Sequence, residues 1–307
     1  MNPINTVHIV GMGALGLLYG SIIRKNLGAG AVTYVMDPVR YEKYQSATYR
    51  INGTDTPFRI IPCTEAQPCD LLIVAVKNPG LASALEVMKS SVGPDTAIVS
   101  VMNGTTSEET IGGIFGMERM LHTVAQGTDA TCFGGHLNYS AAGYLCLGVV
   151  PPAPDALLDR VCAFFDKAGI SYVREADIRR RIWSKYMLNV GLNQSCMVFG
   201  TTYGDINTEG SESRMTMVAA MREVILVANA EGIALCEEDL RQYLELMHTM
   251  APDNMPSMAQ DRVNKKPSEV DMFAGNVLKL AEKHGIPAPA NAFLLRRVRE
   301  IEAEYGR

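Results

Sequence analysis

The chain has 307 residues, of which 47% are hydrophobic and 20% are charged, and its net charge is −5. This composition is typical of a globular protein long enough for two domains, and it does not indicate disorder. Because the chain has no basic surplus and no long block of Lys and Arg, we expect neither a nucleic acid nor a membrane as a partner.

Seven cysteines are scattered along the chain, without a CxxC pair or a His-rich partner segment. This pattern favours a reduced, cytoplasmic protein over a disulfide scaffold, and it predicts no metal site. The N-terminal residues lack the basic and apolar regions of a signal peptide, and no run approaches the roughly 18 apolar residues of a membrane span. We therefore expect a soluble protein.

The first part of the chain alternates short, continuous apolar runs with helical patterns; the runs lie at residues 6–11, 31–37, 70–77 and 96–104. Apolar strands separated by helices indicate a parallel sheet that is covered on both faces. Asn52 and Gly53 predict a hairpin inserted before the third parallel strand. Thr106 and Glu109 have the spacing of a capping box, which predicts the start of a helix.

The pattern changes in the second part of the chain. Residues 120–150 have β character, residues 152–168 indicate a helix and "SYVREA" (171–176) indicates a strand. After Asp177 the β signal nearly disappears, and helical windows follow at 177–199, 211–231, 237–250, 268–284 and 290–305. The sequence thus predicts an α/β domain over residues 1–176 and an all-helical domain over residues 177–307.

The segment "GMGALG" carries Gly11, Gly13 and Gly16 in GxGxxG spacing, directly after the first strand and at the start of a helix. Such glycines let the backbone approach a pyrophosphate, whose charge the helix N-terminus favours. Ala14 and Leu15 lie inside this loop and belong to the predicted cofactor-binding residues. The α/β domain is therefore predicted to be a Rossmann-type dinucleotide-binding domain.

Asp37 lies at the end of the second strand, about 20 residues beyond the glycine loop. Its carboxylate can accept hydrogen bonds from the adenine ribose of NAD and would repel a 2′-phosphate. Arg40 could instead pair with the 2′-phosphate of NADP. These two residues leave NAD and NADP open, and a plain turn-forming role for Asp37 before Pro38 is an alternative.

Lys77 and Asn103 follow two of the predicted parallel strands. Ligands of open α/β sheets gather at the carboxyl edge of the strands, so both residues are candidates for the cofactor site. A solvated lysine and a turn residue before Gly104 are the alternatives.

The segment "IWSKYMLNVGLN" (182–193) carries Lys185, Asn189 and Asn193 four residues apart, so these side chains share one face of a helix. A solvated stripe is the alternative to a functional site. A Ser-His or Cys-His hydrolase has little support, because there is no GxSxG motif and the histidines are isolated from nucleophiles.

The order of these features, followed by "PSMAQD" and "SEVDMFAGNVL", resembles the ketopantoate reductase (2-dehydropantoate 2-reductase) family over about residues 6–305. The resemblance implies a Rossmann domain joined to an all-helical domain. It also implies reduction of 2-dehydropantoate to D-pantoate with NADPH, a step of pantothenate and coenzyme A biosynthesis.

The resemblance also implies roles for single residues. Lys185 matches the catalytic lysine of the family, Glu269 its active-site glutamate and Lys77 a lysine near the cofactor. Substrate-binding roles are implied for Asn103, which also lies near the nicotinamide in the family, and for Asn189, Asn193 and Ser257. One departure is Asp37, since the family implies a basic residue there for NADPH.

These roles agree with the chemistry of ketone reduction. Hydride delivery develops negative charge on the carbonyl oxygen, which the Lys185 ammonium can stabilise and then protonate. A carboxylate such as Glu269 would hold this amine protonated, although an acidic residue in the first turn of a helix is the alternative for Glu269. Amides and a hydroxyl can bind the substrate without an opposing charge.

We therefore predict an enzyme, an NAD(P)H-dependent 2-oxo acid reductase, with 2-dehydropantoate and NADP as the leading substrate and cofactor. The alternatives are a reductase of another branched 2-oxo acid, which is a D-2-hydroxyacid dehydrogenase, and a non-catalytic protein that senses a dinucleotide. The sequence does not define the oligomeric state, and a homodimer is retained as a hypothesis.

Overall fold

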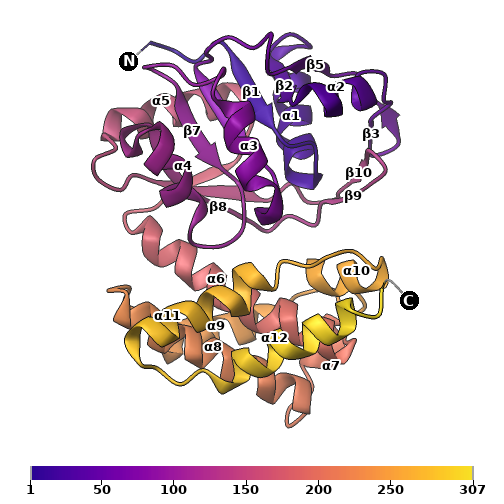
Figure 1. Cartoon of the computed structure of the whole chain (residues 1–307), viewed down its shortest axis with the longest axis vertical. Coiled ribbons are helices and arrows are strands. Elements are labelled where there is room, and N and C mark those ends of the chain that lie inside the picture. Colours follow the sequence, from indigo (N-terminus) through magenta and orange to yellow (C-terminus); the bar gives the residue numbers. More distant parts are fainter. Residues whose placement is uncertain (1, 306–307) are drawn as a thin grey trace. The chain divides into compact units, whose positions relative to one another are not determined.

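The computed structural model describes residues 2–305, and the chain divides into two compact units, Met1–Arg181 and Ile182–Arg307 (Figure 1). The division falls inside one long helix, α6 (Ile178–Phe199). The sequence-based boundary at residue 176 lies shortly before this helix and stays a prediction.

The first unit contains an eight-stranded sheet with the order β12-β11-β8-β7-β6-β1-β2-β5 among the described residues. Its strands are β1 (Val7–Val10), β2 (Val32–Met36), β5 (Arg59–Pro62), β6 (Leu71–Val74), β7 (Ala97–Ser100), β8 (Met120–Gln126), β11 (Tyr144–Gly148) and β12 (Tyr172–Arg174). The four strands predicted to be parallel, β1, β2, β6 and β7, are parallel neighbours. β5 and β8 also run parallel to their neighbours β2 and β7, which was not predicted, whereas β11 runs antiparallel to β8.

Helices cover both faces of this sheet. One face packs against α1 (Ala14–Leu27) and α5 (Asp155–Ala168), and the other against α3 (Leu81–Met88) and α4 (Ser107–Phe115), which lie in front of the strands in Figure 1. The central strands are fully buried, since consecutive residues such as Ile9 and Val10 enter the two opposite cores. Each such side chain contributes roughly 1.5–3 kcal/mol by burial, which explains the continuous apolar runs.

A small second sheet has the order β4-β3-β10-β9. Its strands are β3 (Arg50–Ile51), β4 (Thr54–Asp55), β9 (Thr131–Phe133) and β10 (His136–Asn138). The predicted hairpin joins β3 to β4, and Asn52 and Gly53 form its turn with φ values of 47° and 81°. Because β10 pairs with β3, a segment distant in the sequence completes this sheet.

A helix, α4, starts directly after Thr106 as predicted, but the capping box from which this start was predicted is wrong. Thr106 occupies the N-cap position, but its side chain makes no capping hydrogen bond. Its ψ is −10°, whereas the capping geometry needs an extended backbone that directs the hydroxyl toward the first turn. Instead, the carbonyl of Thr106 accepts a hydrogen bond from the Thr110 hydroxyl.

The remaining short elements of the first unit are α2 (Pro38–Tyr44), η1 (Asn78–Gly80) and η2 (Met117–Arg119). All regular elements among the described residues of the second unit are helices. It comprises most of α6, followed by α7 (Tyr203–Ile206), α8 (Glu212–Ala230), α9 (Glu237–Met247), α10 (Ser257–Val263), a π-helical turn η3 (Asp271–Gly275), α11 (Asn276–His284) and α12 (Pro289–Glu302).

The core of the helical unit is built around α6 and α8, where Met187, Val190, Met221 and Val224 are fully buried. The predicted end of the fourth helical window is correct, since Gly285 closes α11 with a φ of 66°. Two short helices, α7 and α10, lie outside the predicted windows. The predicted fold class, a Rossmann-type α/β domain followed by an all-helical domain, is confirmed.

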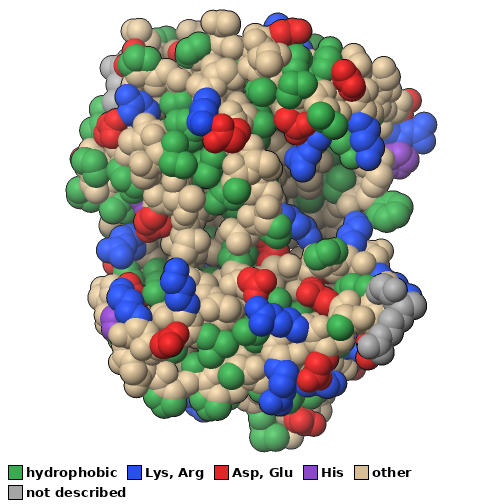
Figure 2. Space-filling model, in the orientation of Figure 1, with side chains coloured by type: hydrophobic (Ala, Val, Ile, Leu, Met, Phe, Trp, Pro, Cys, Tyr) green, Lys and Arg blue, Asp and Glu red, His purple; other side chains and the backbone are tan. Residues whose placement is uncertain are grey.

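No helix within residues 2–305 is both long and apolar enough to span a membrane. On the face drawn in Figure 2, basic and acidic side chains are interspersed over the surface.

Candidate active site

The glycine loop connects β1 to α1 in the first unit. Gly11 has a φ of 112°, and a Cβ atom there would lie 2.4 Å from the carbonyl oxygen of Ala75. A Cβ atom at Gly16 would lie 2.1 Å from the carbonyl oxygen of Gly11, so the helix can pack this closely only with glycine. Gly13 is the N-cap of α1 and faces open space. The loop thus leaves room for phosphates at the helix N-terminus.

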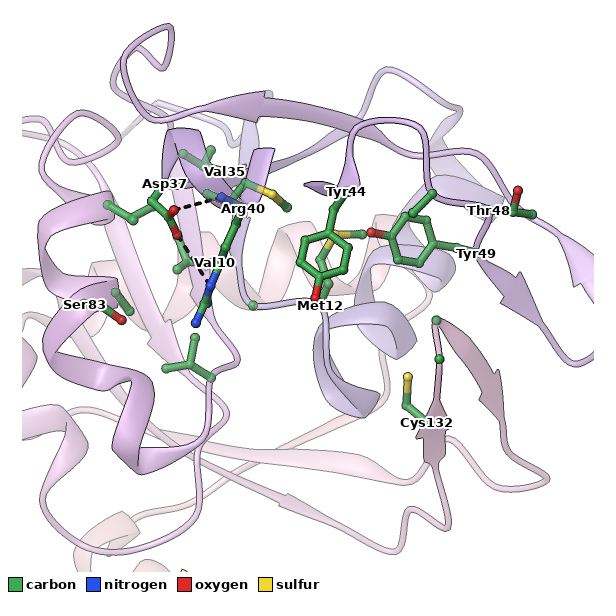
Figure 3. Close-up of a pocket in the computed structure, with 18 residues that line it drawn as sticks. Val10, Met12, Val35, Asp37, Arg40, Tyr44, Thr48, Tyr49, Ser83 and Cys132 are labelled. Atoms are coloured by element: carbon green, nitrogen blue, oxygen red, sulfur yellow. Dashed lines mark hydrogen bonds and ion pairs between the residues drawn. The ribbon is translucent and has the colours of Figure 1, made fainter. Parts of the chain in front are cut away.

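A cavity of about 460 Å³ lies beside this loop (Figure 3). Its size is in the range of ligand-binding pockets. Three of the predicted cofactor-binding residues line it: Gly11, Asp37 and Arg40. The others lie outside its wall: Gly13, Ala14, Leu15, Gly16, Lys77 and Asn103.

Asp37 and Arg40 interact with each other at the wall of this cavity. The Asp37 carboxylate caps α2 by accepting a hydrogen bond of 2.9 Å from the Arg40 backbone N–H. Its second oxygen lies 3.5 Å from the Arg40 Nε, and both side chains are substantially exposed. The carboxylate is therefore engaged by the start of α2, while the guanidinium extends along the cavity in Figure 3.

Lys77 and Asn103 follow neighbouring parallel strands, because Val74 of β6 is paired with Ser100 of β7. Lys77 is exposed and precedes the short helix η1. Asn103 is half-buried and precedes Gly104, whose φ of 100° turns the chain toward α4.

In the helical unit, the predicted polar stripe lies on α6. Asn189 and Asn193 are only 9% and 6% exposed, so a solvated stripe does not describe them. The Asn193 Nδ2 donates to the Asn189 Oδ1 at 3.3 Å, and the Ser257 hydroxyl donates to the Asn193 Oδ1 at 3.0 Å. The backbone N–H of Met258 also donates to this oxygen, at 3.4 Å. Three predicted substrate-binding residues therefore form one hydrogen-bonded chain.

The two predicted catalytic residues lie on different elements of this unit. Lys185 is half-buried on α6, one helical turn before Asn189. Glu269 is 9% exposed and lies two residues before the π-helical turn begins at Asp271, and its carbonyl accepts hydrogen bonds from the N–H groups of Met272 and Phe273. Glu269 is thus buried at the start of this helical segment, and its catalytic role stays a prediction beside the alternative of an acidic residue in a first helical turn.

Two family models match the chain. The model described as "Ketopantoate reductase PanE/ApbA" matches residues 7–151, and "Ketopantoate reductase PanE/ApbA C terminal" matches residues 177–302. The chain belongs to the ketopantoate reductase PanE/ApbA family.

Relatives and solved structures agree with this family. A 2-dehydropantoate 2-reductase of Streptococcus pyogenes serotype M1 is 28% identical over 302 residues, which cover 97% of this chain and 98% of that protein. The crystal structure of a PanE/ApbA family ketopantoate reductase from Ralstonia eutropha JMP134 has a TM-score of 0.84 at 25% identity, covering 98% of this chain and 100% of that one. A ternary structure of D-mandelate dehydrogenase with NADH and anilino(oxo)acetate has a TM-score of 0.86 at 20% identity, covering 98% and 99%, which shows a shared fold.

Membership in the ketopantoate reductase family makes this chain an oxidoreductase, as predicted from the sequence. Members of the family use a nicotinamide dinucleotide, and the glycine loop fits one, because Gly13 leaves open space at the N-terminus of α1. The fourteen residues of α1 and its position after β1 correspond to the predicted strand-loop-helix unit.

Part of the cavity wall was not predicted from the sequence of this ketopantoate reductase family member. Tyr44 lies one helical turn after Arg40 on α2, and its ring lies between Arg40 and Tyr49 in Figure 3. The spacing of Arg40 and Tyr44 is a signal that could have identified Tyr44. Cys132 and Gly135 reach the wall from the strands β9 and β10 and their turn, through pairing that no local motif indicates.

A buried polar cluster beneath α4 was also not predicted. The Ser107 hydroxyl donates to the Glu108 carboxylate at 2.7 Å and lies 3.0 Å from the Ser100 hydroxyl. Glu108 is 2% exposed, and burial raises its pKa to about 7. His122 on β8 is also buried, and burial, assisted by the charge of Arg179, lowers its pKa to about 4. Both groups are therefore held toward their neutral forms.

Proposed function

We propose that this chain reduces the ketone of 2-dehydropantoate with NADPH, giving D-pantoate. The observation that carries the proposal is the hydrogen-bonded chain of Asn189, Asn193 and Ser257, which lies on and against the helix that also carries Lys185. The relatives named 2-dehydropantoate 2-reductase support the choice of substrate. We assign dinucleotide binding to a domain of residues 1–176 and substrate binding to a domain of residues 177–307.

The bound nicotinamide supplies the hydride for this reaction. Lys185 carries the complementary role of a general acid, because its ammonium stabilises the negative charge that develops on the carbonyl oxygen and then donates a proton to it. Glu269 holds this amine protonated and oriented. We assign Asn103 a role in binding the nicotinamide and the substrate, and Lys77 the role of a positive charge near the cofactor.

The direction of the hydrogen bonds in the polar chain determines which groups remain for a substrate. Ser257 donates to Asn193, and Asn193 donates to Asn189, so the amide Nδ2 of Asn189 is the donor at the end of the chain. This amide can bind the substrate carboxylate. The lone pairs of the Ser257 oxygen can accept a hydrogen bond from a hydroxyl group, and 2-dehydropantoate carries one.

The choice of NADPH rests on Asp37 and Arg40. Because the Asp37 carboxylate caps α2 and faces the Arg40 guanidinium, its negative charge is partly compensated at the point where a 2′-phosphate would bind. Arg40 keeps a substantially exposed guanidinium at the cavity for this phosphate. NADH is the alternative, with Asp37 accepting hydrogen bonds from the ribose.

The test is steady-state oxidation of NADPH and NADH with 2-dehydropantoate and a panel of branched and aromatic 2-oxo acids. We expect the highest kcat/KM for 2-dehydropantoate with NADPH. A higher kcat/KM for another 2-oxo acid would overturn the substrate, and turnover of no ketone despite cofactor binding would favour a dinucleotide sensor.

We further propose that the protein is a homodimer, because a ketopantoate reductase from Staphylococcus aureus with the same fold is dimeric. Sedimentation equilibrium measures this directly, and a monomer mass at micromolar concentration would contradict it.

A further inference from the structure

The segment that follows Glu269 contains a π-helical turn, η3, in which one extra residue widens the helix. Gly275 donates its N–H to the carbonyl of Val270 at 3.1 Å, five residues back, and Phe273 donates to the carbonyl of Glu269 at 3.1 Å. Between them, the N–H of Ala274 donates to the side-chain Oε1 of Gln194 at 3.0 Å. A side-chain oxygen of α6 thus accepts a backbone hydrogen bond inside the turn.

Gln194 is built into the core for this contact. Its side chain is 0% exposed, and its Nε2 donates to the carbonyl of Val190 at 2.6 Å. Both ends of the amide are therefore hydrogen-bonded, which fixes the orientation of the oxygen toward Ala274.

Tyr186 contacts the same turn, at two backbone carbonyl groups of the turn. Its buried hydroxyl lies 3.0 Å from the carbonyl oxygen of Met272 and 2.8 Å from that of Phe273, and it donates to them. The hydroxyl in turn accepts a hydrogen bond of 3.4 Å from the Asn276 Nδ2. Its ring packs against Phe273 with the centroids 6.2 Å apart.

Gln194 and Tyr186, which contact the π-helical turn, lie on α6 directly beside the polar stripe of Lys185, Asn189 and Asn193. Tyr186, Val190 and Gln194 each follow one residue after Lys185, Asn189 and Asn193, so they form a second stripe beside the first. One stripe of α6 carries the proposed catalytic and substrate groups, and the adjacent stripe holds the turn that begins two residues after Glu269.

We propose that Gln194 and Tyr186 are positioning residues, which fix the π-helical turn and thereby set the place of Glu269 in the reaction. This proposal rests on the function proposed above for Lys185 and Glu269. A misplacement of a catalytic group by about 1 Å can lower a rate by roughly 10²-fold, so a rigid support for Glu269 has direct kinetic value. The extra residue of the turn makes such a support necessary, because it interrupts the regular hydrogen-bond ladder.

The principal test is Gln194→Met, which keeps the length and apolar bulk of the side chain but removes the acceptor for Ala274. We expect kcat to fall roughly 10- to 100-fold while the Kd for NADPH stays unchanged. The pH above which kcat declines should also move down, since a displaced Glu269 no longer holds the amine protonated. A loss of packing alone would not move this pH profile.

The matched control is Ser195→Ala. Ser195 is the next residue on α6, is also 0% exposed, and its hydroxyl has no hydrogen-bond partner among the described residues. This variant should keep the kcat and the pH profile of the unaltered protein. Gln194→Glu is the conservative variant, because a protonated carboxyl group can replace both hydrogen bonds of the amide. It should retain more kcat at pH 6 than Gln194→Met does.

A second variant, Tyr186→Phe, removes only a hydroxyl and protects the test against a failure of Gln194→Met to fold. Amide hydrogen exchange of residues 270–276 reports on the turn without any need for turnover. Exchange there should rise in Gln194→Met and Tyr186→Phe but not in Ser195→Ala. Unchanged exchange, or an unchanged kcat and pH profile in folded variants, overturns the positioning role. If the unaltered protein and every variant lack turnover while hydrogen exchange responds as expected, the proposed function is wrong. The conclusion that Gln194 and Tyr186 stabilise the π-helical turn is then retained.

Discussion

The Ser257 hydroxyl on α10 donates a hydrogen bond of 3.0 Å to the Asn193 Oδ1 on α6, although 64 residues separate the two in the sequence. This bond joins two proposed substrate-binding residues. It also orients a third, because Asn193 accepts from Ser257 through its Oδ1 and donates to the Asn189 Oδ1 through its Nδ2. The proposed binding groups for the 2-oxo acid are therefore linked into one hydrogen-bonded unit, with Asn193 at its centre.

Asn193→Ala should consequently impair substrate binding more than the loss of either end of this chain. Two donors, Ser257 and the backbone N–H of Met258, lose a buried acceptor, which costs about 1–3 kcal/mol. We expect the KM for the 2-oxo acid to rise roughly 10- to 100-fold, with an unchanged Kd for NADPH. Steady-state kinetics and cofactor fluorescence measure both quantities.

Asn229→Ala in the same unit is the control for Asn193→Ala. Asn229 on α8 donates to the carbonyls of Ile225 and Leu235, so its loss also removes two partly buried hydrogen bonds. It should lower stability without changing the KM. An Asn193→Ala protein with the KM of the unaltered enzyme would contradict the substrate role.

Lys185→Ala should lower kcat roughly 10²-fold or more, because general acid catalysis of carbonyl reduction is lost. Single-turnover rates, measured with the enzyme saturated by both the 2-oxo acid and NADPH, separate this loss from changes in binding. Lys279→Ala on α11 removes an exposed lysine of the same unit and serves as a charge-matched control. If kcat is the same in both variants, Lys185 is not the general acid.

Arg40→Ala should weaken NADPH binding about tenfold while leaving NADH nearly unaffected, because only NADPH carries the 2′-phosphate that the guanidinium would pair with. Arg50→Ala, which removes another exposed ion pair, with Asp55, at a residue that does not line the cavity, is the control. Titration of each cofactor by fluorescence measures the preference. Equal losses for NADPH and NADH in Arg40→Ala would argue against a phosphate-binding role.

The sequence predicted best those features that depend on local spacing. The glycine loop and the stripe of Lys185, Asn189 and Asn193 follow from the geometry of one turn or one helix, and each prediction needed only neighbouring residues. The contact of Asn193 with Ser257 could not be predicted from helical periodicity, because α10 lay outside the predicted helices.

Features that depend on distant contacts were not predictable. The π-helical turn interrupts the window 268–284, which has a continuous helical pattern, and its support by Gln194 comes from a residue 80 positions away. Cys132 reaches the cavity through the pairing of β10 with β3. The pair Glu108 and Glu109 has the pattern of exposed acids in a first helical turn, and only the packing of α4 on the sheet buries Glu108.

This buried Glu108 should make stability depend on pH. Because its pKa is raised from 4.5 in the unfolded chain to about 7 in the folded protein, the folded state binds more protons between these values. The contribution of Glu108 is therefore most favourable below pH 4.5 and is lost as the pH rises through 7, by roughly 3 kcal/mol. His122 acts in the opposite direction: its lowered pKa gives a contribution that is complete above pH 6.5 and is lost as the pH falls toward 4.

Glu108→Gln separates these two contributions, since the amide is isosteric and neutral at every pH. We expect this variant to be more stable than the unaltered protein at pH 8, with the two curves converging toward pH 5. Its remaining pH dependence should rise from pH 4 to 6.5, as the buried His122 requires, and His122→Gln should remove that slope. Urea unfolding at half-unit pH intervals measures the free energy of unfolding for each protein. A carboxyl group with a raised pKa makes the free energy of unfolding fall as the pH rises. If the free energy of unfolding has the same slope between pH 5 and 8 in the unaltered protein and in Glu108→Gln, the pKa of Glu108 is not raised.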